Sequence, residues 1–96
     1  MTRFLYDWRK SLINEEKHGI GFEEAKRLWD DPFRATMFLN HKGERRYLLI
    51  ARYGGTLWAA VCTDRGRAVR IISVRRATRR EVRIYDRRGA SYGRGN

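Results

Sequence analysis

The sequence predicts an α+β fold in which N-terminal helices pack on a small antiparallel β-sheet (a meander) and a short helix follows it. Three observations predict this class. Apolar residues recur at helical spacing in the first third of the chain. Apolar, β-branched runs separated by glycine-containing turns occupy the middle. A helix-capping signature follows the last run. At 96 residues the chain has the size of one domain.

The first helix is predicted over residues 7–17. Asp7 is a favourable N-cap, and Gly19 suits the left-handed position at which many helices end. Trp8 and Leu12 are four residues apart and therefore share one side of the helix. We expect this apolar side to pack on the sheet or on the other helix.

The second helix is predicted over residues 22–30. Phe22, Ala25 and Trp29 form its apolar stripe, and Pro32 marks its end. Because the stripe occupies one side only, we expect this helix also to lie against the sheet.

Three strands are predicted, over residues 47–53, 57–63 and 69–75. They are rich in Tyr, Val, Ile and Leu, and the segments between them have the composition of tight turns. Strands joined by such short turns must run antiparallel, which gives a meander. In the last strand, strict alternation would place Ile71, Ser73 and Arg75 on one face and Ile72, Val74 and Arg76 on the other.

The expected core includes the three tryptophans, Trp8, Trp29 and Trp58, at the interface between the helices and the sheet. Cys62 has no partner for an internal disulfide and lies in an apolar, strand-like run. We therefore interpret it as a small buried side chain and not as a nucleophile.

The final helix is predicted from Arg79 to about Arg87. Thr78 can accept a hydrogen bond from the amide of Glu81, and the Glu81 carboxylate can reach back to the amide of Thr78. Residues 89–96 show no periodicity and are expected to form a disordered tail. The expected domain thus spans residues 1–88.

Positive charge is confined to the second half of the chain. The net charge is +11; residues 1–44 sum to zero, whereas residues 45–96 hold fourteen Arg, no Lys and three acidic residues. Guanidinium groups bind phosphate oxygens in a bidentate geometry, so this composition favours a polyanionic partner. The alternative is a solvated face that uses arginine for compositional reasons.

Several other classes are disfavoured. The longest apolar run, residues 57–62, is too short to span a bilayer, and the charged N-terminus is unlike a signal peptide, so a cytoplasmic location is expected. His18, His41 and Cys62 lack the close spacing of zinc ligands, and no metal or cofactor is expected. The segment 19–21 begins like a dinucleotide fingerprint but does not complete it.

The landmarks together resemble the BrnT toxins of bacterial type II toxin–antitoxin systems, over roughly residues 4–88. The residues that carry the resemblance are Asp7, Lys10, Asn14, Lys17-His18-Gly19-Ile20, Phe22-Glu23-Glu24-Ala25, Asp31-Pro32, Glu44-Arg45, Arg70-Ile71-Ile72-Ser73 and Arg76-Ala77-Thr78-Arg79-Arg80-Glu81.

The resemblance implies a compact RelE-like fold and a toxin domain over residues 1–88. It also implies endoribonuclease activity and neutralisation by a ribbon-helix-helix (BrnA-like) antitoxin in a hetero-oligomer. Gly21 stands where the family usually has Ser at the N-cap of the second helix.

RNA cleavage without a metal requires a deprotonated 2′-hydroxyl, a stabilised pentavalent phosphate and a protonated 5′-oxygen leaving group. Arginine can supply the second requirement, and the start of the last helix adds free amides. The candidates for phosphate and transition-state contacts are Arg65, Arg75 and Arg79. Those for RNA binding are Lys17, Arg45, Arg70, Arg76 and Arg80.

The proton-transfer groups are harder to assign from the sequence. His18 could act as acid or base, or could simply cap the C-terminal end of the first helix. Glu44 could be a base or form an ion pair at the rim, and Glu81 is better explained by capping. Tyr85 could be an acid or a core residue. Lys17 could contact phosphate or be an ordinary surface lysine.

Three functions are compatible with these features. The first is an endoribonuclease toxin that cuts single-stranded or ribosome-associated RNA (mRNA) by metal-independent transesterification. The second is a nucleic-acid-binding or regulatory module of the same fold without catalysis. The third is an arginine-rich face that serves mainly to bind an acidic antitoxin segment.

Overall fold

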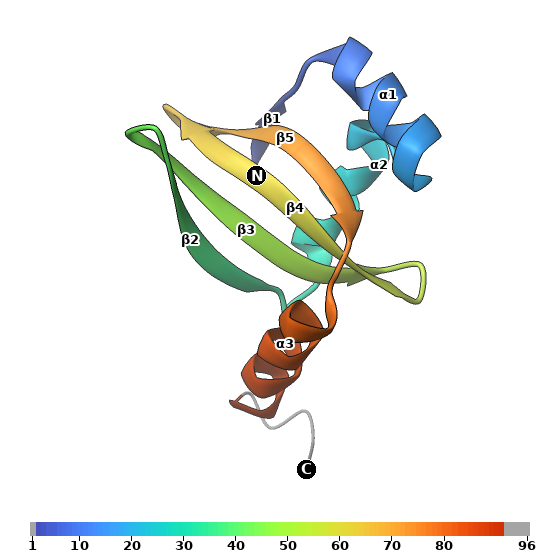
Figure 1. Cartoon of the computed structure of the whole chain (residues 1–96), viewed down its shortest axis with the longest axis vertical. Helices are drawn as coiled ribbons and strands as arrows, with labels where there is room; N and C mark the ends of the chain where they lie inside the picture. Colours follow the sequence, from blue (N-terminus) through green and yellow to red (C-terminus); the bar gives the residue numbers. More distant parts are fainter. Residues whose placement is uncertain (1, 92–96) are drawn as a thin grey trace.

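The computed structural model describes residues 2–91 of the chain (Figure 1). It confirms the predicted α+β class. Its elements in chain order are β1 (Arg3–Leu5), α1 (Trp8–His18), α2 (Phe22–Ala25), the 3₁₀ helix η1 (Lys26–Asp30), β2 (Ala35–His41), β3 (Glu44–Tyr53), β4 (Thr56–Arg65), β5 (Ala68–Arg76) and α3 (Arg79–Ser91).

The five strands form one mixed sheet in the order β1-β5-β4-β3-β2. The predicted meander is confirmed as β3, β4 and β5, and antiparallel β2 extends it by pairing with β3. The three-residue strand β1 pairs in parallel with β5, from Arg3 beside Ala68 to Leu5 beside Arg70. Sequence reasoning did not predict β1 or β2. β1 is too short to show a periodic pattern, and β2 is an edge strand that ends in polar residues.

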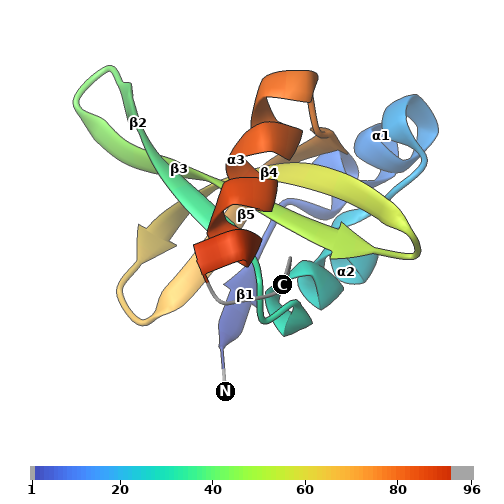
Figure 2. The ribbon, with the colours of Figure 1, turned by 90° about the horizontal axis from the view of Figure 1, so that it is seen from below.

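The sheet buries side chains on both faces. On β3, Leu49 and Ala51 belong to one cluster, packed beneath α2 and η1, while Leu48 and Ile50 belong to the other, which includes Tyr85 of α3. Figures 1 and 2 show α3 on one side of the sheet and α1 and α2 on the other. Cys62 is buried, as predicted. Trp58 is buried, and Trp29 packs partly buried against the same cluster.

Helix α1 has the predicted caps, but the side that carries Trp8 and Leu12 faces away from the sheet. The N–H of Arg9 donates to Asp7 Oδ1 (2.9 Å), and Gly19 adopts a left-handed conformation (φ 82°). Trp8 and Leu12, however, are 63% and 57% exposed, so the prediction that they pack inward is wrong. The buried residue of α1 is polar.

That buried residue is Asn14, and its carboxamide joins α1 to β5. Its Nδ2 donates to the carbonyls of Ile20 (2.8 Å) and Val74 (2.9 Å), and the N–H of Val74 donates to its Oδ1 (3.2 Å). Because pairing with β1 ends at Arg70, this stretch of β5 has no strand on its outer side. The Asn14 side chain takes the place of that strand, which satisfies both backbone groups of Val74.

The second helical segment is confirmed over residues 22–30, although its second half is 3₁₀ and not α. Phe22 and Ala25 are buried as predicted. Gly21 offers no side-chain cap; instead Ser11 Oγ of α1 accepts the N–H of Phe22 (2.7 Å). A Cβ at Gly21 would lie 3.3 Å from that oxygen, so the glycine permits α1 to cap α2.

A β-bulge changes which residues share a face of β5. Val61 pairs with Ser73 while Cys62 pairs with Ile71, so Ile72 is the extra residue. After the bulge, Val74 faces the same cluster as Ile71. The strict alternation predicted for this strand is therefore wrong beyond Ile71: Arg76 lies on the α1 face of the sheet and Arg75 on the α3 face.

The capping box of α3 is confirmed in both directions. The N–H of Thr78 donates to Glu81 Oε1 (2.8 Å), and the N–H of Glu81 donates to Thr78 Oγ1 (3.3 Å). The helix continues to Ser91, so the predicted end near Arg87 is too early, and residues 89–91 are helical rather than part of a tail. The rest of the predicted tail, residues 92–96, lies outside the described residues.

We expect Asn14→Ala to lower the free energy of unfolding by about 3 kcal/mol, because it leaves three buried backbone groups without their partner. Urea unfolding followed by circular dichroism measures the change. Leu12→Ala, on the exposed side of the same helix, is the control and should change stability by less than about 0.5 kcal/mol. Equal stabilities for the two variants would contradict this role of Asn14.

Candidate functional site

Two chain segments far apart in the sequence meet at one end of the sheet. Lys17 and His18, at the end of α1, and Arg75 and Arg76, at the end of β5, line a hollow of about 490 Å³. Lys17, His18 and Arg76 are exposed. The Asn14 link to Val74 fixes this meeting, since it lies one turn before His18 and immediately before Arg75.

Arg75 and Arg76 have different environments because they lie on opposite faces of β5. Arg75 forms a bidentate pair with Glu81 (Nη1 to Oε1 2.7 Å, Nη2 to Oε2 2.9 Å). Arg76 is exposed, and its guanidinium carbon lies 6.0 Å from the centre of the Trp58 ring. Arg75 is therefore held by the protein, whereas Arg76 presents its guanidinium to the hollow.

Glu81 is the acidic partner within this cationic region. The hydrogen bonds from Arg75, together with the N–H of Thr78, hold the pKa of the Glu81 carboxyl below its usual value although burial acts in the opposite direction. Its interpretation as a capping residue is confirmed, and the same carboxylate also orients Arg75.

Arg79 and Arg80 follow in the first turn of α3, and both are exposed. The positive end of a helix dipole disfavours cations there, and Glu81 in the same turn offsets part of that cost. We use the name basic corner for the six residues Lys17, His18, Arg75, Arg76, Arg79 and Arg80.

Arg65 and Glu44 lie at the other end of the sheet. Glu44 binds Arg46 (3.1 Å) and Arg65 (3.1 Å), and the hydrogen bond from Arg46 is the main reason that its pKa is lowered. Arg65 pairs with Ala68 at the start of β5, eight residues before Arg76, which corresponds to about 26 Å along the strand. The structure therefore does not bring Arg65 together with Arg75, and Glu44 forms the rim ion pairs that the sequence left as an alternative.

Arg45 and Arg70 are also outside the basic corner. The guanidinium carbon of Arg45 lies 5.5 Å from the centre of the exposed Phe38 ring. Arg70 is half-buried and pairs with Thr63, near the start of β5. The structure therefore divides the predicted RNA-binding residues between the two ends of the sheet.

Tyr85 is a core residue. It is 2% exposed, and its hydroxyl donates to Asp31 Oδ2 (2.7 Å). Asp31 also accepts the N–H groups of Phe33 (2.9 Å) and Arg52 (2.8 Å). Burial alone would raise the pKa of Asp31, but these hydrogen bonds hold it below its usual value. Of the two interpretations that the sequence allowed for Tyr85, the structure supports the core residue.

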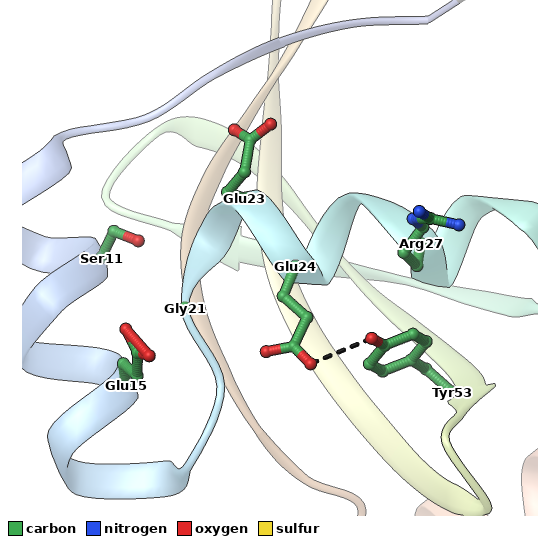
Figure 3. Close-up of a pocket in the computed structure, with 7 residues that line it drawn as sticks. All are labelled: Ser11, Glu15, Gly21, Glu23, Glu24, Arg27 and Tyr53. Atoms are coloured by element: carbon green, nitrogen blue, oxygen red, sulfur yellow. Dashed lines mark hydrogen bonds between the residues drawn. The ribbon is translucent and has the colours of Figure 1, made fainter.

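A second hollow, of about 430 Å³, has the opposite charge and was not predicted. Glu15, Glu23 and Glu24 line it together with one cation, Arg27, and with Tyr53, whose hydroxyl donates to Glu24 Oε2 (2.9 Å; Figure 3). Three carboxylates would repel a phosphate backbone, so the two hollows differ in the ligands they can accept.

The chain has one cysteine, and it is buried. Burial raises the pKa of the Cys62 thiol to about 12, which keeps it protonated and unreactive.

Within residues 2–91, no three His, Cys, Asp or Glu side chains are grouped in a way that could hold a metal ion. No helix in this part of the chain is long and apolar enough to cross a membrane.

A small α+β domain that presents three cationic side chains and an imidazole around a hollow, with two more arginines in the first turn of α3, has the character of a protein that binds a phosphate backbone. The chain belongs to the BrnT family. The family model described as "Ribonuclease toxin, BrnT, of type II toxin-antitoxin system" matches residues 6–81, most of the chain. The comparison with curated proteins gives no match.

Membership confirms the resemblance in the sequence and fixes the general function. The chain is a ribonuclease toxin of a type II toxin–antitoxin system, so RNA is its substrate and an antitoxin is its partner. The match ends at Glu81 and includes every residue of the basic corner.

We expect Tyr85→Phe to lower the free energy of unfolding by about 1 kcal/mol through loss of one hydrogen bond to Asp31. RNA cleavage by the folded variant should remain within about twofold of the parent rate. Urea unfolding and an RNA cleavage assay measure the two effects. A fall of about 100-fold or more in rate at unchanged stability would restore Tyr85 as a proton donor in catalysis.

We expect Glu81→Gln to make the free energy of unfolding less dependent on pH in the acidic range. The lowered pKa of Glu81 means that its ionised form stabilises the fold at pH values above its unfolded pKa of about 4.3. This contribution disappears as the pH falls through the lower, folded-state pKa. The variant should thus be less stable by about 2 kcal/mol at pH 7, and the difference should shrink below about pH 4.

Urea midpoints at pH 7 and pH 3 measure this difference. Glu16→Gln, on the exposed side of α1, is the control. It makes the same chemical change at a residue that has no ion pair with the basic corner, so it should leave both midpoints nearly unchanged. A constant difference between the parent and Glu81→Gln across this range would show that the carboxylate charge is not what stabilises the start of α3.

Proposed function

We propose that this toxin is a metal-independent endoribonuclease that cleaves mRNA by transesterification at the basic corner, and thereby inhibits translation and growth. The observation that carries the proposal is the meeting of His18 and Lys17 with Arg75 and Arg76 around one hollow. This arrangement brings a group that can transfer protons next to groups that bind phosphate.

In this proposal His18 removes the proton of the 2′-hydroxyl or donates one to the leaving 5′-oxygen. Imidazole can do either near neutral pH. The other predicted proton-transfer groups give less support: Glu44 is at the far end of the sheet in two ion pairs, and Tyr85 is buried against Asp31. His18 is exposed and lines the hollow.

Arg76 and Lys17 are the groups that we assign to the phosphate. Arg76 is exposed beside the hollow, where its charge could stabilise the pentavalent phosphate as negative charge develops. Arg75 is already bound to Glu81, so we assign it as a positioning residue that also adds positive potential. Arg79 and Arg80 would bind neighbouring phosphates of the RNA.

We also propose that the antitoxin is of the ribbon-helix-helix type and that the toxin acts in the cytoplasm. Both proposals, like the relation to RelE, rest on the family resemblance and on composition. An acidic antitoxin segment that covers the basic corner would inhibit cleavage by excluding RNA, because both would compete for the same guanidinium groups.

A non-catalytic role is favoured by one observation. Transesterification involves two proton transfers, whereas the basic corner includes one imidazole, and the carboxylate beside it, that of Glu81, is bound to Arg75 and to the N–H of Thr78. In this second candidate function the corner binds RNA without cutting it, or is completed by groups of the ribosome.

We expect the purified chain to cleave defined RNA in excess EDTA and to leave 2′,3′-cyclic phosphate ends. His18→Ala and Arg76→Ala should each lower the rate by about 100-fold or more, because one removes proton transfer and the other removes charge stabilisation. Gel analysis of end-labelled RNA, with chemical analysis of the product ends, measures both effects.

Arg67→Ala is the matched control. Arg67 is an exposed arginine in the turn between β4 and β5, at the far end of the sheet from the hollow, and its substitution removes the same charge. It should retain near-parental cleavage. Intact RNA that is nevertheless bound by the folded protein, with and without ribosomes, would overturn the catalytic proposal in favour of the binding module. Cleavage that stops in EDTA would overturn metal independence.

A further inference from the structure

The start of α1 and the end of β1 expose several large apolar side chains. Among residues 2–91, five large apolar side chains are clearly exposed, and four of them lie close together in sequence, namely Leu5 (38%), Trp8 (63%), Leu12 (57%) and Ile13 (61%). Leu5 ends β1 and the other three lie on α1; we call the four together the α1 stripe. Isolated exposed apolar residues are ordinary, but a contiguous group marks a surface that another molecule covers.

The α1 stripe is not available to the protein's own core. The side of α1 that faces the sheet is polar: Asn14 binds the backbone of β5, and Ser11 caps α2. With 3.6 residues per turn, Trp8 and Leu12 lie on the side of the helix away from Asn14. This inverted helix cannot rotate to bury the stripe without breaking the hydrogen bonds that attach it.

The chemistry of the stripe selects its partner. The stripe lies in the half of the chain that has no net charge, so the charge that matters is that of the basic corner at the other end of α1, which attracts an acidic chain and repels a second copy. RNA could stack on Trp8, but Leu12 and Ile13 are aliphatic and offer a base no aromatic face. A protein with apolar side chains and negative charge fits both the stripe and the basic corner.

We infer that the α1 stripe is the surface on which the antitoxin anchors itself. The anchoring segment presents apolar side chains to Trp8, Leu12 and Ile13 and carries acidic residues that continue to the basic corner. That the chain has an antitoxin follows from its family; that the corner is the RNA site rests on the function proposed above.

The dimensions fit one continuous segment. From Trp8 to His18, α1 is about 15 Å long, so a partner segment that lies along it passes from the stripe to the hollow within about three helical turns. Lys17 and His18 occupy the last turn of α1, where the partner's acidic residues would meet them. Glu15 and Glu16 lie just before that turn. Because they would repel acidic side chains, the partner should carry no acidic residues where it passes them.

Trp8 is the expected anchor of this interface. Its ring carries the guanidinium of Arg9 at 5.4 Å on one side and is otherwise largely open to solvent. Tryptophan is among the residues that contribute most when they become buried in an interface, and a neighbouring arginine can shield the contact from water.

The test uses the full chain and its antitoxin. Calorimetry without RNA should show that Trp8→Ala and Leu12→Ala each weaken binding by at least about 30-fold. Phe38→Ala is the control: Phe38 is 73% exposed on β2, the strand at the opposite edge of the sheet, and its truncation should leave affinity unchanged. Circular dichroism checks that all three variants are folded.

A second measurement separates this inference from the proposed function. The α1 variants should cleave RNA as the parent does, and an amount of antitoxin that silences the parent should not silence them. Because calorimetry does not depend on cleavage, the stripe can be tested even if the chain proves inactive on RNA.

Parental affinity in both α1 variants, or equal losses in these and Phe38→Ala, would overturn the inference. A parent chain that is dimeric by light scattering, and monomeric after Leu12→Ala with antitoxin affinity unchanged, would overturn it in favour of self-association.

Discussion

The pairing of the Asn14 carboxamide with the backbone of Val74 is the interaction on which the arrangement of this toxin depends. β1 accompanies β5 for three residues only, and beyond Arg70 the outer side of β5 needs other partners for its polar groups. One side chain supplies them and also binds the carbonyl of Ile20. The end of α1 is thereby fixed beside the end of β5, which creates the hollow between His18 and Arg76.

The bulge at Ile72 then divides two consecutive arginines between two tasks. Without the extra residue, Arg75 would lie on the α1 face and Arg76 on the α3 face. With it, Arg75 reaches Glu81 and ties the end of β5 to the start of α3, and Arg76 is left exposed at the hollow. A single inserted residue therefore lets one strand end both stabilise the fold and supply an exposed cation to the basic corner.

The elements that sequence reasoning predicted are those whose signals are local. The Asp7 and Gly19 caps, the meander and the Thr78 to Glu81 capping box each depend on residues close in sequence, and the structure contains all of them. Three other features depend on contacts between residues far apart in the sequence, so a short stretch of sequence does not reveal them. These are the bulge, the three-residue strand β1 and the exposure of Trp8. For the same reason the arginines could be recognised by type but not assigned to the two ends of the sheet.

The buried residue of α1 is polar and three of its exposed residues are large and apolar, which departs from the usual pattern of a surface helix. A helix with this arrangement gains little from burial, so its position depends on directed hydrogen bonds. Such bonds specify orientation more narrowly than apolar packing does, because a carboxamide must align with both backbone groups of Val74. Local rules are commonly broken where function requires it, and here the broken rule places His18 beside the end of β5 and leaves Trp8, Leu12 and Ile13 exposed.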